Sequence, residues 1–163
     1  MILEPTQPSR RALLLGLLTS VTAAACGGSS DTAPTPVNET WVANVPFSTT
    51  DLTVGTGDEV VNGLVLSVDY VGWLYSTATS DNKGNPFDTS CPSTCSPLQF
   101  TVGAGRLIKG FEQGVVGMKI GGIRRVTIPP DLAYGATGSS PAIPPNATLI
   151  FEIRANGVVV TAA

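Results

Sequence analysis

Two stretches of the chain place an apolar residue at every second position, and this pattern limits the fold more than any other feature. In segment 64–75, LVLSVDYVGWLY, the alternate positions carry Leu64, Leu66, Val68, Tyr70, Gly72 and Leu74. Segment 147–155, ATLIFEIRA, repeats the pattern with Leu149, Phe151 and Ile153. Because side chains alternate between the two faces of a strand, both segments are predicted to be strands with one apolar face.

Two shorter segments, 99–102 (QFTV) and 123–129 (IRRVTIP), are predicted as further strands. Pro129 and Pro130 end the second of them, because proline lacks the N–H group that a strand ladder needs.

One segment alone suits a helix, 109–118 (KGFEQGVVGM), in which Phe111, Val115 and Met118 are spaced to share a face. Its three glycines each cost up to about 1 kcal/mol relative to alanine. We expect so short a helix to persist only where it packs on a sheet. The predicted fold is therefore of the α+β class, with an antiparallel β-sheet curled around one short α-helix.

The composition excludes several classes of function. The formal net charge is −3, whereas a nucleic-acid binder normally presents a basic face. The chain contains no histidine, which rules out a histidine-based catalytic triad and most zinc sites. We therefore expect no nucleic-acid partner, no metal and no cofactor.

The N-terminal segment 9–26, SRRALLLGLLTSVTAAAC, has the layout of an export signal. Its apolar run is shorter than the roughly 20 residues that a membrane-spanning helix needs. SRRALLL resembles a twin-arginine signal, and an ordinary secretory signal is the alternative. TAAAC resembles a bacterial lipoprotein cleavage site that would lipidate Cys26, although Ala23 stands where such sites usually carry leucine. Simple cleavage after the alanines is the alternative.

These features predict three parts of the chain: a signal peptide at 1–25, a lipidated cysteine with a flexible tether at 26–45, and a domain at 46–163. Residues 27–40, GGSSDTAPTPVNET, are too polar to bury an apolar surface of their own. Acyl chains on Cys26 would hold the protein on a membrane. We expect an exported, membrane-anchored monomer that faces the periplasm or the cell surface.

The other two cysteines, Cys91 and Cys95, lie close together in SCPSTCS. Export places them in an oxidising compartment, so a disulfide across this loop is predicted in preference to free thiols.

Four motifs resemble, in order and spacing, those of the FKBP-type peptidyl-prolyl cis-trans isomerases. They are VDYVGWL, NPFDTS, LIKGFEQGVVGMKIGG and IPPDLAYGATGSSPAIPPNATLIFEI. The resemblance extends from about Leu52 to Val160. It implies catalysis of rotation about X-Pro peptide bonds, proline-containing polypeptides as partners, and affinity for FK506- or rapamycin-like macrolides.

The resemblance also implies the residues of the site. Matching the motifs identifies six residues as catalytic: Tyr70, Phe87, Asp88, Ile108, Tyr134 and Phe151. It identifies four more as substrate-binding: Phe100, Leu107, Phe111 and Ile143. Without the resemblance, Phe100, Phe151 and Ile143 would be interpreted as core residues.

This reaction suits a site with few reactive groups, because no covalent bond breaks. We expect the phenylalanines to form a dry pocket with proline over Phe111. The Ile108 amide and the Tyr134 hydroxyl are expected to donate to substrate carbonyls. The resemblance implies that Asp88 orients groups or interacts with the twisted amide rather than acting as a general base. Phe111 stands where the family often has tryptophan. The altered loops at 139–142 and on either side of NPFD are expected to change substrate preference and macrolide affinity.

Two other functions fit the same sequence. The pocket could bind proline-containing segments without turnover, as a membrane-tethered binding module or chaperone. A purely structural surface lipoprotein is the third hypothesis, and it predicts no binding of proline peptides or macrolides.

Overall fold

The computed structural model describes residues 45–159. The predicted signal peptide, Cys26 and all but the last residue of the tether lie outside the described residues. Within them, every strand pair is antiparallel. The strands are β1 (Ser48–Thr53), β2 (Val65–Tyr75), β3 (Lys83–Thr89), β4 (Leu98–Thr101), β5 (Ile123–Ile128) and β6 (Leu149–Val158).

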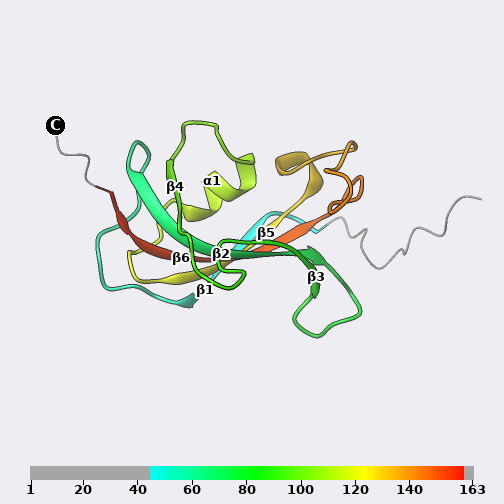
Figure 1. Cartoon of the computed structure of the whole chain (residues 1–163), viewed down its shortest axis with the longest axis horizontal. Coiled ribbons are helices and arrows are strands. Elements are labelled where there is room, and N and C mark those ends of the chain that lie inside the picture. Colours follow the sequence, from blue (N-terminus) through cyan, green and yellow to red (C-terminus); the bar gives the residue numbers. More distant parts are fainter. Residues whose placement is uncertain (1–44, 160–163) are drawn as a thin grey trace, which may run out of the picture. The chain divides into compact units, whose positions relative to one another are not determined.

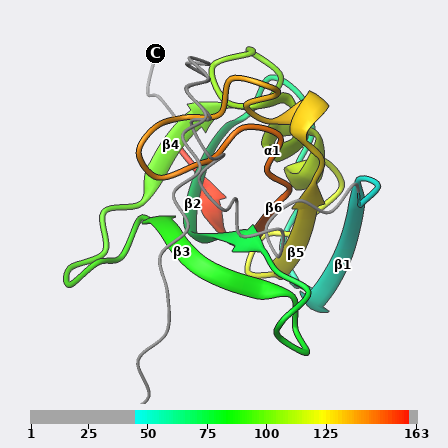
Figure 2. The same cartoon turned by 90° about the vertical axis from the view of Figure 1, so that its right-hand side faces the viewer.

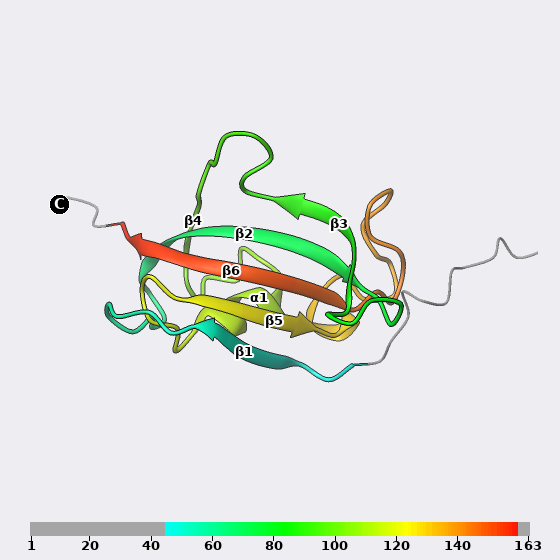
Figure 3. The same cartoon turned by 90° about the horizontal axis from the view of Figure 1, so that it is seen from below.

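The six strands occupy five positions in one sheet, in the order β1-β5-β6-β2, followed by β3 and β4 on the outer edge of β2 (Figure 3). The first half of β2 pairs with β4, from Val65 opposite Thr101 to Val68 opposite Leu98. Its second half pairs with β3, from Val71 opposite Thr89 to Tyr75 opposite Lys83. Residues 90–97 loop out between these two partners.

The loop 90–97 contains a disulfide between Cys91 and Cys95, whose Cα atoms are 3.9 Å apart. The Ser96 N–H donates to the Ser90 carbonyl at 2.8 Å. The Ser90 hydroxyl in turn accepts from the Tyr70 N–H at 2.9 Å. These bonds attach the base of the loop to the middle of β2.

The helix α1 (Lys109–Val115) lies against one face of the curved sheet, as Figures 1 and 2 show. Two of its glycines face β5. A Cβ atom at Gly114 would lie 2.7 Å from a methyl group of Val126, and one at Gly110 would overlap Ile128. The glycines that weaken the isolated helix therefore let its backbone lie directly on the sheet.

The core fills the space between the helix and the concave face of the sheet. Phe111, Val115 and Met118 are at most 3% exposed, as their shared face predicts. Opposite them lie the apolar alternate residues of the two long strands: Leu66, Val68, Leu74, Leu149, Phe151 and Ile153. The predicted fold class is confirmed.

Arg124, on β5, joins three elements. Its Nη1 donates to the carbonyl oxygens of Gly114 at 3.1 Å and Val116 at 3.0 Å, near the end of α1. Its Nε donates to Asp51 of β1 at 2.6 Å. The hydrogen bond and charge of Arg124 outweigh the opposing effect of burial and lower the pKa of Asp51.

The structure differs from the sequence prediction in a few elements. The helix ends at Val115 rather than at Met118, because Val116 is already extended, with φ −63° and ψ 135°. The strands β1 and β3 were not predicted. Every residue of β1 is exposed, so no apolar alternation marks it, and β3 contains Pro86 and Gly84. Neither described helix is long and apolar enough to cross a bilayer.

Candidate active site

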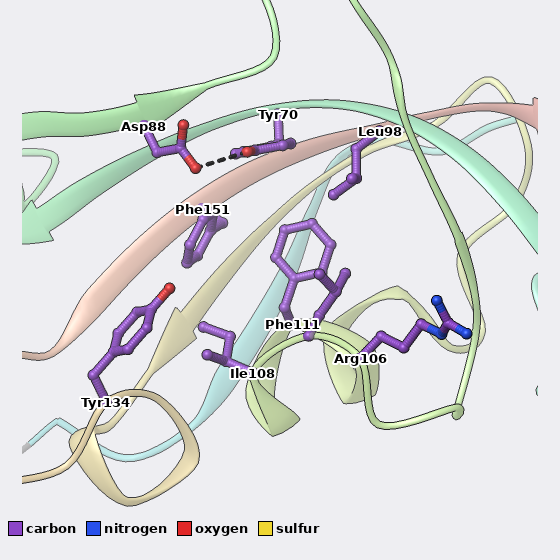
Figure 4. Close-up of a pocket in the computed structure, with 9 residues that line it drawn as sticks. Tyr70, Asp88, Leu98, Arg106, Ile108, Phe111, Tyr134 and Phe151 are labelled. Atoms are coloured by element: carbon purple, nitrogen blue, oxygen red, sulfur yellow. Dashed lines mark hydrogen bonds between the residues drawn. The ribbon is translucent and has the colours of Figure 1, made fainter. Parts of the chain in front are cut away.

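A cavity of about 340 Å³ opens between α1, the sheet and the segment after β5. Figure 4 shows most of its lining. Phe111 of α1 forms the floor, Phe151 of β6 and Tyr70 of β2 form one wall, and Tyr134 stands opposite. Tyr134 follows the short 3₁₀ helix η2 (Pro130–Leu132). The nine lining residues are Tyr70, Asp88, Leu98, Arg106, Leu107, Ile108, Phe111, Tyr134 and Phe151.

Phe111 packs nearly perpendicular to two other aromatic rings of the lining. Phe111 meets Phe151 edge to face with ring centroids 5.2 Å apart, and it meets Tyr70 in the same way at 5.7 Å. Edge-to-face pairs at these distances are favourable beyond the area they bury. The floor and wall are therefore a rigid apolar surface rather than a set of independent side chains.

One hydrogen bond crosses the polar side of the cavity. The Tyr70 hydroxyl donates to Asp88 Oδ2 at 2.7 Å, and the Thr89 N–H donates to Asp88 Oδ1 at 2.8 Å. Both carboxylate oxygens thus accept a bond within the protein. Burial first, and then the bond to Asp88, raise the pKa of Tyr70, so its hydroxyl remains a donor far above neutral pH.

One hydroxyl and one backbone N–H at the cavity have no acceptor among residues 45–159. One is the hydroxyl of Tyr134, a residue that is 39% exposed. Its partial burial and then the charge of Asp88 raise the pKa of Tyr134. The other is the N–H of Ile108, which precedes α1 in an extended conformation with φ −60° and ψ 141°. A bound molecule with carbonyl oxygens could accept from both.

Glu112 fixes the backbone that leads to Ile108. Its carboxylate accepts from the Leu107 N–H at 3.0 Å and from the Gly105 N–H at 3.1 Å. Burial alone would raise the pKa of Glu112, but the backbone N–H groups around it lower the pKa overall. The Glu112 side chain therefore organises the loop that precedes α1.

The structure brings seven of the ten predicted site residues to the cavity surface. The three others, Phe87, Phe100 and Ile143, are not among its lining residues. Phe87 packs edge to face on Phe151 with centroids 5.5 Å apart, and Phe100, 5% exposed, packs on Phe111 at 5.9 Å. Ile143 is buried in the core cluster, and its N–H and carbonyl both bond to Ser139. Phe87 and Phe100 thus pack against aromatic residues of the lining.

Sequence reasoning missed two lining residues, Leu98 and Arg106, and one supporting residue, Glu112. Leu98 shares a strand face with Phe100, so the alternation in LQF was an available signal. Arg106 carried no such signal, because a charged residue in a turn is usually exposed to solvent. Glu112 could have been suspected as an acid on the buried side of a helix, next to Phe111.

Comparison with known proteins gives a consistent result. The model of the family described as FKBP-type peptidyl-prolyl cis-trans isomerase matches residues 57–156, more than half of the chain. A Neisseria meningitidis serogroup A protein named FK506-binding protein is 46% identical over 104 residues, which span 64% of this chain and 88% of that protein.

Solved structures show the same fold. The crystal structure of AtFKBP13 superposes with a TM-score of 0.59 at 35% identity, covering 69% of this chain and 93% of that one. A peptidyl-prolyl cis-trans isomerase from Pseudomonas syringae pv. tomato gives a TM-score of 0.56 at 32% identity, covering 70% of this chain and 76% of that one. The chain is therefore an enzyme of this class and belongs to the FKBP-type peptidyl-prolyl cis-trans isomerases.

Proposed function

We propose that the cavity holds the proline ring of an X-Pro segment over Phe111 and speeds rotation about the bond that precedes the proline, in polypeptides exported from the cell. The observation that carries this proposal is the combination of a rigid aromatic floor with two unengaged donors, Tyr134 and Ile108, on the same cavity.

The energetics explain why an apolar pocket suffices. Rotation must overcome the loss of amide resonance, a barrier of about 18–20 kcal/mol, and uncatalysed exchange takes on the order of 10–100 s. An acceleration of about 10⁵-fold corresponds to only about 7 kcal/mol. The twisted amide has less charge separation than the planar one. Water stabilises the planar form more, so transfer into a dry pocket lowers the relative barrier.

The two donors would hold the segment while its central bond rotates. A carbonyl oxygen on one side of that bond accepts from the Ile108 N–H, and a neighbouring carbonyl accepts from the Tyr134 hydroxyl. With both ends held, the aromatic floor need only accommodate the twisted form. Fixing the segment in this way also lowers the entropy cost of reaching the transition state.

Asp88 has a positioning role in this scheme. Its two oxygens already accept from Tyr70 and from the Thr89 N–H at 2.7 and 2.8 Å. These bonds hold the Tyr70 ring in the wall of the cavity. No proton leaves the substrate during rotation, so a general base has no step to perform.

The same cavity is proposed to bind FK506- or rapamycin-like macrolides, since relatives that share this domain are named for binding FK506. The setting is proposed from the N-terminal residues: export directed by segment 9–26 and anchoring to a membrane through acyl chains on Cys26. The substrates would then be proteins that fold after crossing a membrane.

The proposal is tested by NMR exchange spectroscopy, which measures the rate of cis/trans exchange in proline peptides with and without the intact chain. We expect faster exchange that a macrolide of the FK506 type inhibits. Phe111→Leu, which removes the aromatic floor but keeps an apolar side chain, should lower kcat/KM. Val61→Leu, at an exposed position away from the cavity, is the control.

The outcomes separate the alternatives. Binding of the peptides without faster exchange would overturn catalysis and favour the binding module. If neither binding nor faster exchange were seen, a structural role would remain. An unchanged kcat/KM in the Phe111→Leu variant would contradict the role given to the aromatic floor.

A further inference from the structure

The cavity carries one basic side chain, Arg106, at the end farther from Asp88. Figure 4 shows Asp88 beside Tyr70 and Phe151, while Arg106 lies beyond Phe111 on the helix side. Arg106 and Asp88 are both exposed. The two ends of an otherwise uncharged lining thus differ in sign.

Arg106 has no partner among the described residues. The ion pairs formed there use Lys83, Arg124 and Arg125 as their cations, and no hydrogen bond of residues 45–159 involves the Arg106 guanidinium. The contrast with Arg124 is clear, because that guanidinium binds a carboxylate and three backbone carbonyl oxygens. Arg106 is the guanidinium left available at the cavity.

The backbone on either side of Arg106 is fixed although its side chain is free. The N–H groups of Gly105 and Leu107 both donate to the buried Glu112 carboxylate. Glu112 is 7% exposed and uses its oxygens for these bonds, and it forms no ion pair with Arg106. The backbone at Arg106 is therefore held in place, two residues before Ile108 in the sequence.

These observations assign Arg106 a role in choosing substrates. We propose that its guanidinium binds an Asp or Glu side chain close to the isomerised X-Pro bond, so that the enzyme prefers acidic proline segments to basic ones. This inference rests on the proposed function, since it takes the cavity as the proline site. A guanidinium offers N–H groups in a planar fork that matches a carboxylate.

The expected effect is moderate because the side chain is exposed. An exposed pair of this kind is worth roughly a two- to fivefold difference in kcat/KM. The preference should weaken as salt rises, because the Debye length falls from about 10 Å at 0.1 M to about 3 Å at 1 M. A preference that came from packing rather than charge would not respond to salt in this way.

The test compares three peptide sets that carry Glu, Gln or Lys at each of the two positions before and the two positions after the X-Pro pair. Exchange is measured by NMR, which avoids a coupling protease whose own specificity would respond to the flanking charge. The intact chain, Arg106→Gln and Arg106→Glu are each assayed at low and high salt.

We expect the unmodified chain to favour Glu over Lys at one or more positions, Arg106→Gln to remove that ratio, and Arg106→Glu to invert it. Lys109→Gln is the matched control, an exposed cation three residues away that does not line the cavity. It should leave the ratio in place.

Equal rates for the three sets, or loss of the ratio in Lys109→Gln as well, would overturn the role of Arg106 while exchange is still accelerated. If no peptide exchanged faster with any variant, the proposed function itself would fail, and this inference with it.

Discussion

At the residue scale, we expect the hydroxyl of Tyr134 to contribute to ligand binding but not to the stability of the fold. It has no acceptor among the described residues, so Tyr134→Phe removes nothing that the fold uses. A lost neutral hydrogen bond of about 0.5–1.5 kcal/mol predicts a two- to tenfold lower kcat/KM, roughly, and an unchanged urea midpoint. NMR exchange assays and urea titrations check both. Tyr75→Phe, the same change on the face of the sheet away from the cavity, should alter neither quantity.

The raised pKa values of Tyr70 and Tyr134 predict the behaviour at high pH. A raised folded pKa favours the protonated form, so the stabilising contribution is complete below the ordinary value of 10.0 and is lost as pH rises through the folded value. Both hydroxyls therefore remain donors across the neutral and mildly alkaline range. We expect kcat/KM to stay level from about pH 7 to about pH 9.5. A decline centred on pH 8 would contradict this.

Glu112 makes a prediction of opposite sign. Its lowered folded pKa favours the ionised form, so its contribution is present above the ordinary value of 4.5 and is lost as pH falls through the folded value. Glu112→Gln replaces one acceptor with a donor that faces N–H groups. It should lower the free energy of unfolding by about 1–3 kcal/mol at neutral pH and flatten the loss of stability on acidification.

Urea titrations at neutral and acidic pH measure this effect. Gln113→Glu, the reverse exchange at the exposed neighbouring position, is the control and should change stability little. If Glu112→Gln were as stable and as acid-sensitive as the unmodified chain, the carboxylate would not organise the loop.

The residues that the sequence could and could not predict differ in a physical way. Tyr70, Phe111 and Phe151 fall in strongly patterned segments whose buried face is determined by periodicity. Arg106 lies in a turn, where the direction of a side chain depends on tertiary contacts such as those of Glu112. A linear pattern holds no information about those contacts.

At the element scale, the closeness of α1 to β5 depends on glycine. Gly114→Ala should lower the free energy of unfolding by about 1–3 kcal/mol, because the added methyl group would overlap Val126. The change opposes helix propensity, which would favour alanine by about 1 kcal/mol. Urea unfolding decides between the two effects. Gly157→Ala, where a Cβ meets no atom within 4 Å, should be nearly neutral.

The same scale shows why some strands were predictable and others were not. β2 and β6 lie at the centre of the sheet and bury one face, so their sequences alternate. β1 has no buried residue, and β3 pairs with β2 through two irregularities in register. Edge strands of this kind are specified by the partner that they meet rather than by their own composition.

At the scale of the whole molecule, the cavity exists only when the core is assembled. Its walls come from Tyr70, Phe111, Tyr134 and Phe151, which are far apart in the chain. Phe111 and Phe151 belong to the core cluster, and Tyr70 packs against it, as do Leu132 and Ala133, which precede Tyr134. The sequence predicted this group through a resemblance to a family, and periodicity could not have separated lining residues from the supporting Phe87 and Phe100.

A ligand that binds only the assembled cavity must therefore stabilise the entire domain. An FK506-like macrolide at about 100 times its Kd should raise the free energy of unfolding by about 2.7 kcal/mol. Thermal unfolding with increasing macrolide measures the shift, and an unrelated macrocycle at equal concentration serves as the control. A Tm that did not depend on macrolide concentration would count against binding at this cavity.

The divided outer edge of β2 has a consequence for engineering. Since β3 and β4 each complete their own half of the ladder, the disulfide-closed segment between them is a natural graft point. A foreign recognition peptide inserted between Ser93 and Thr94 would leave both ladders intact. It would also lie near the cavity, because Thr94 lines a surface hollow together with the cavity residues Tyr70 and Leu98. The loop 90–97 is thus a site at which a binding segment for new substrate proteins could be added without changing the rest of the isomerase.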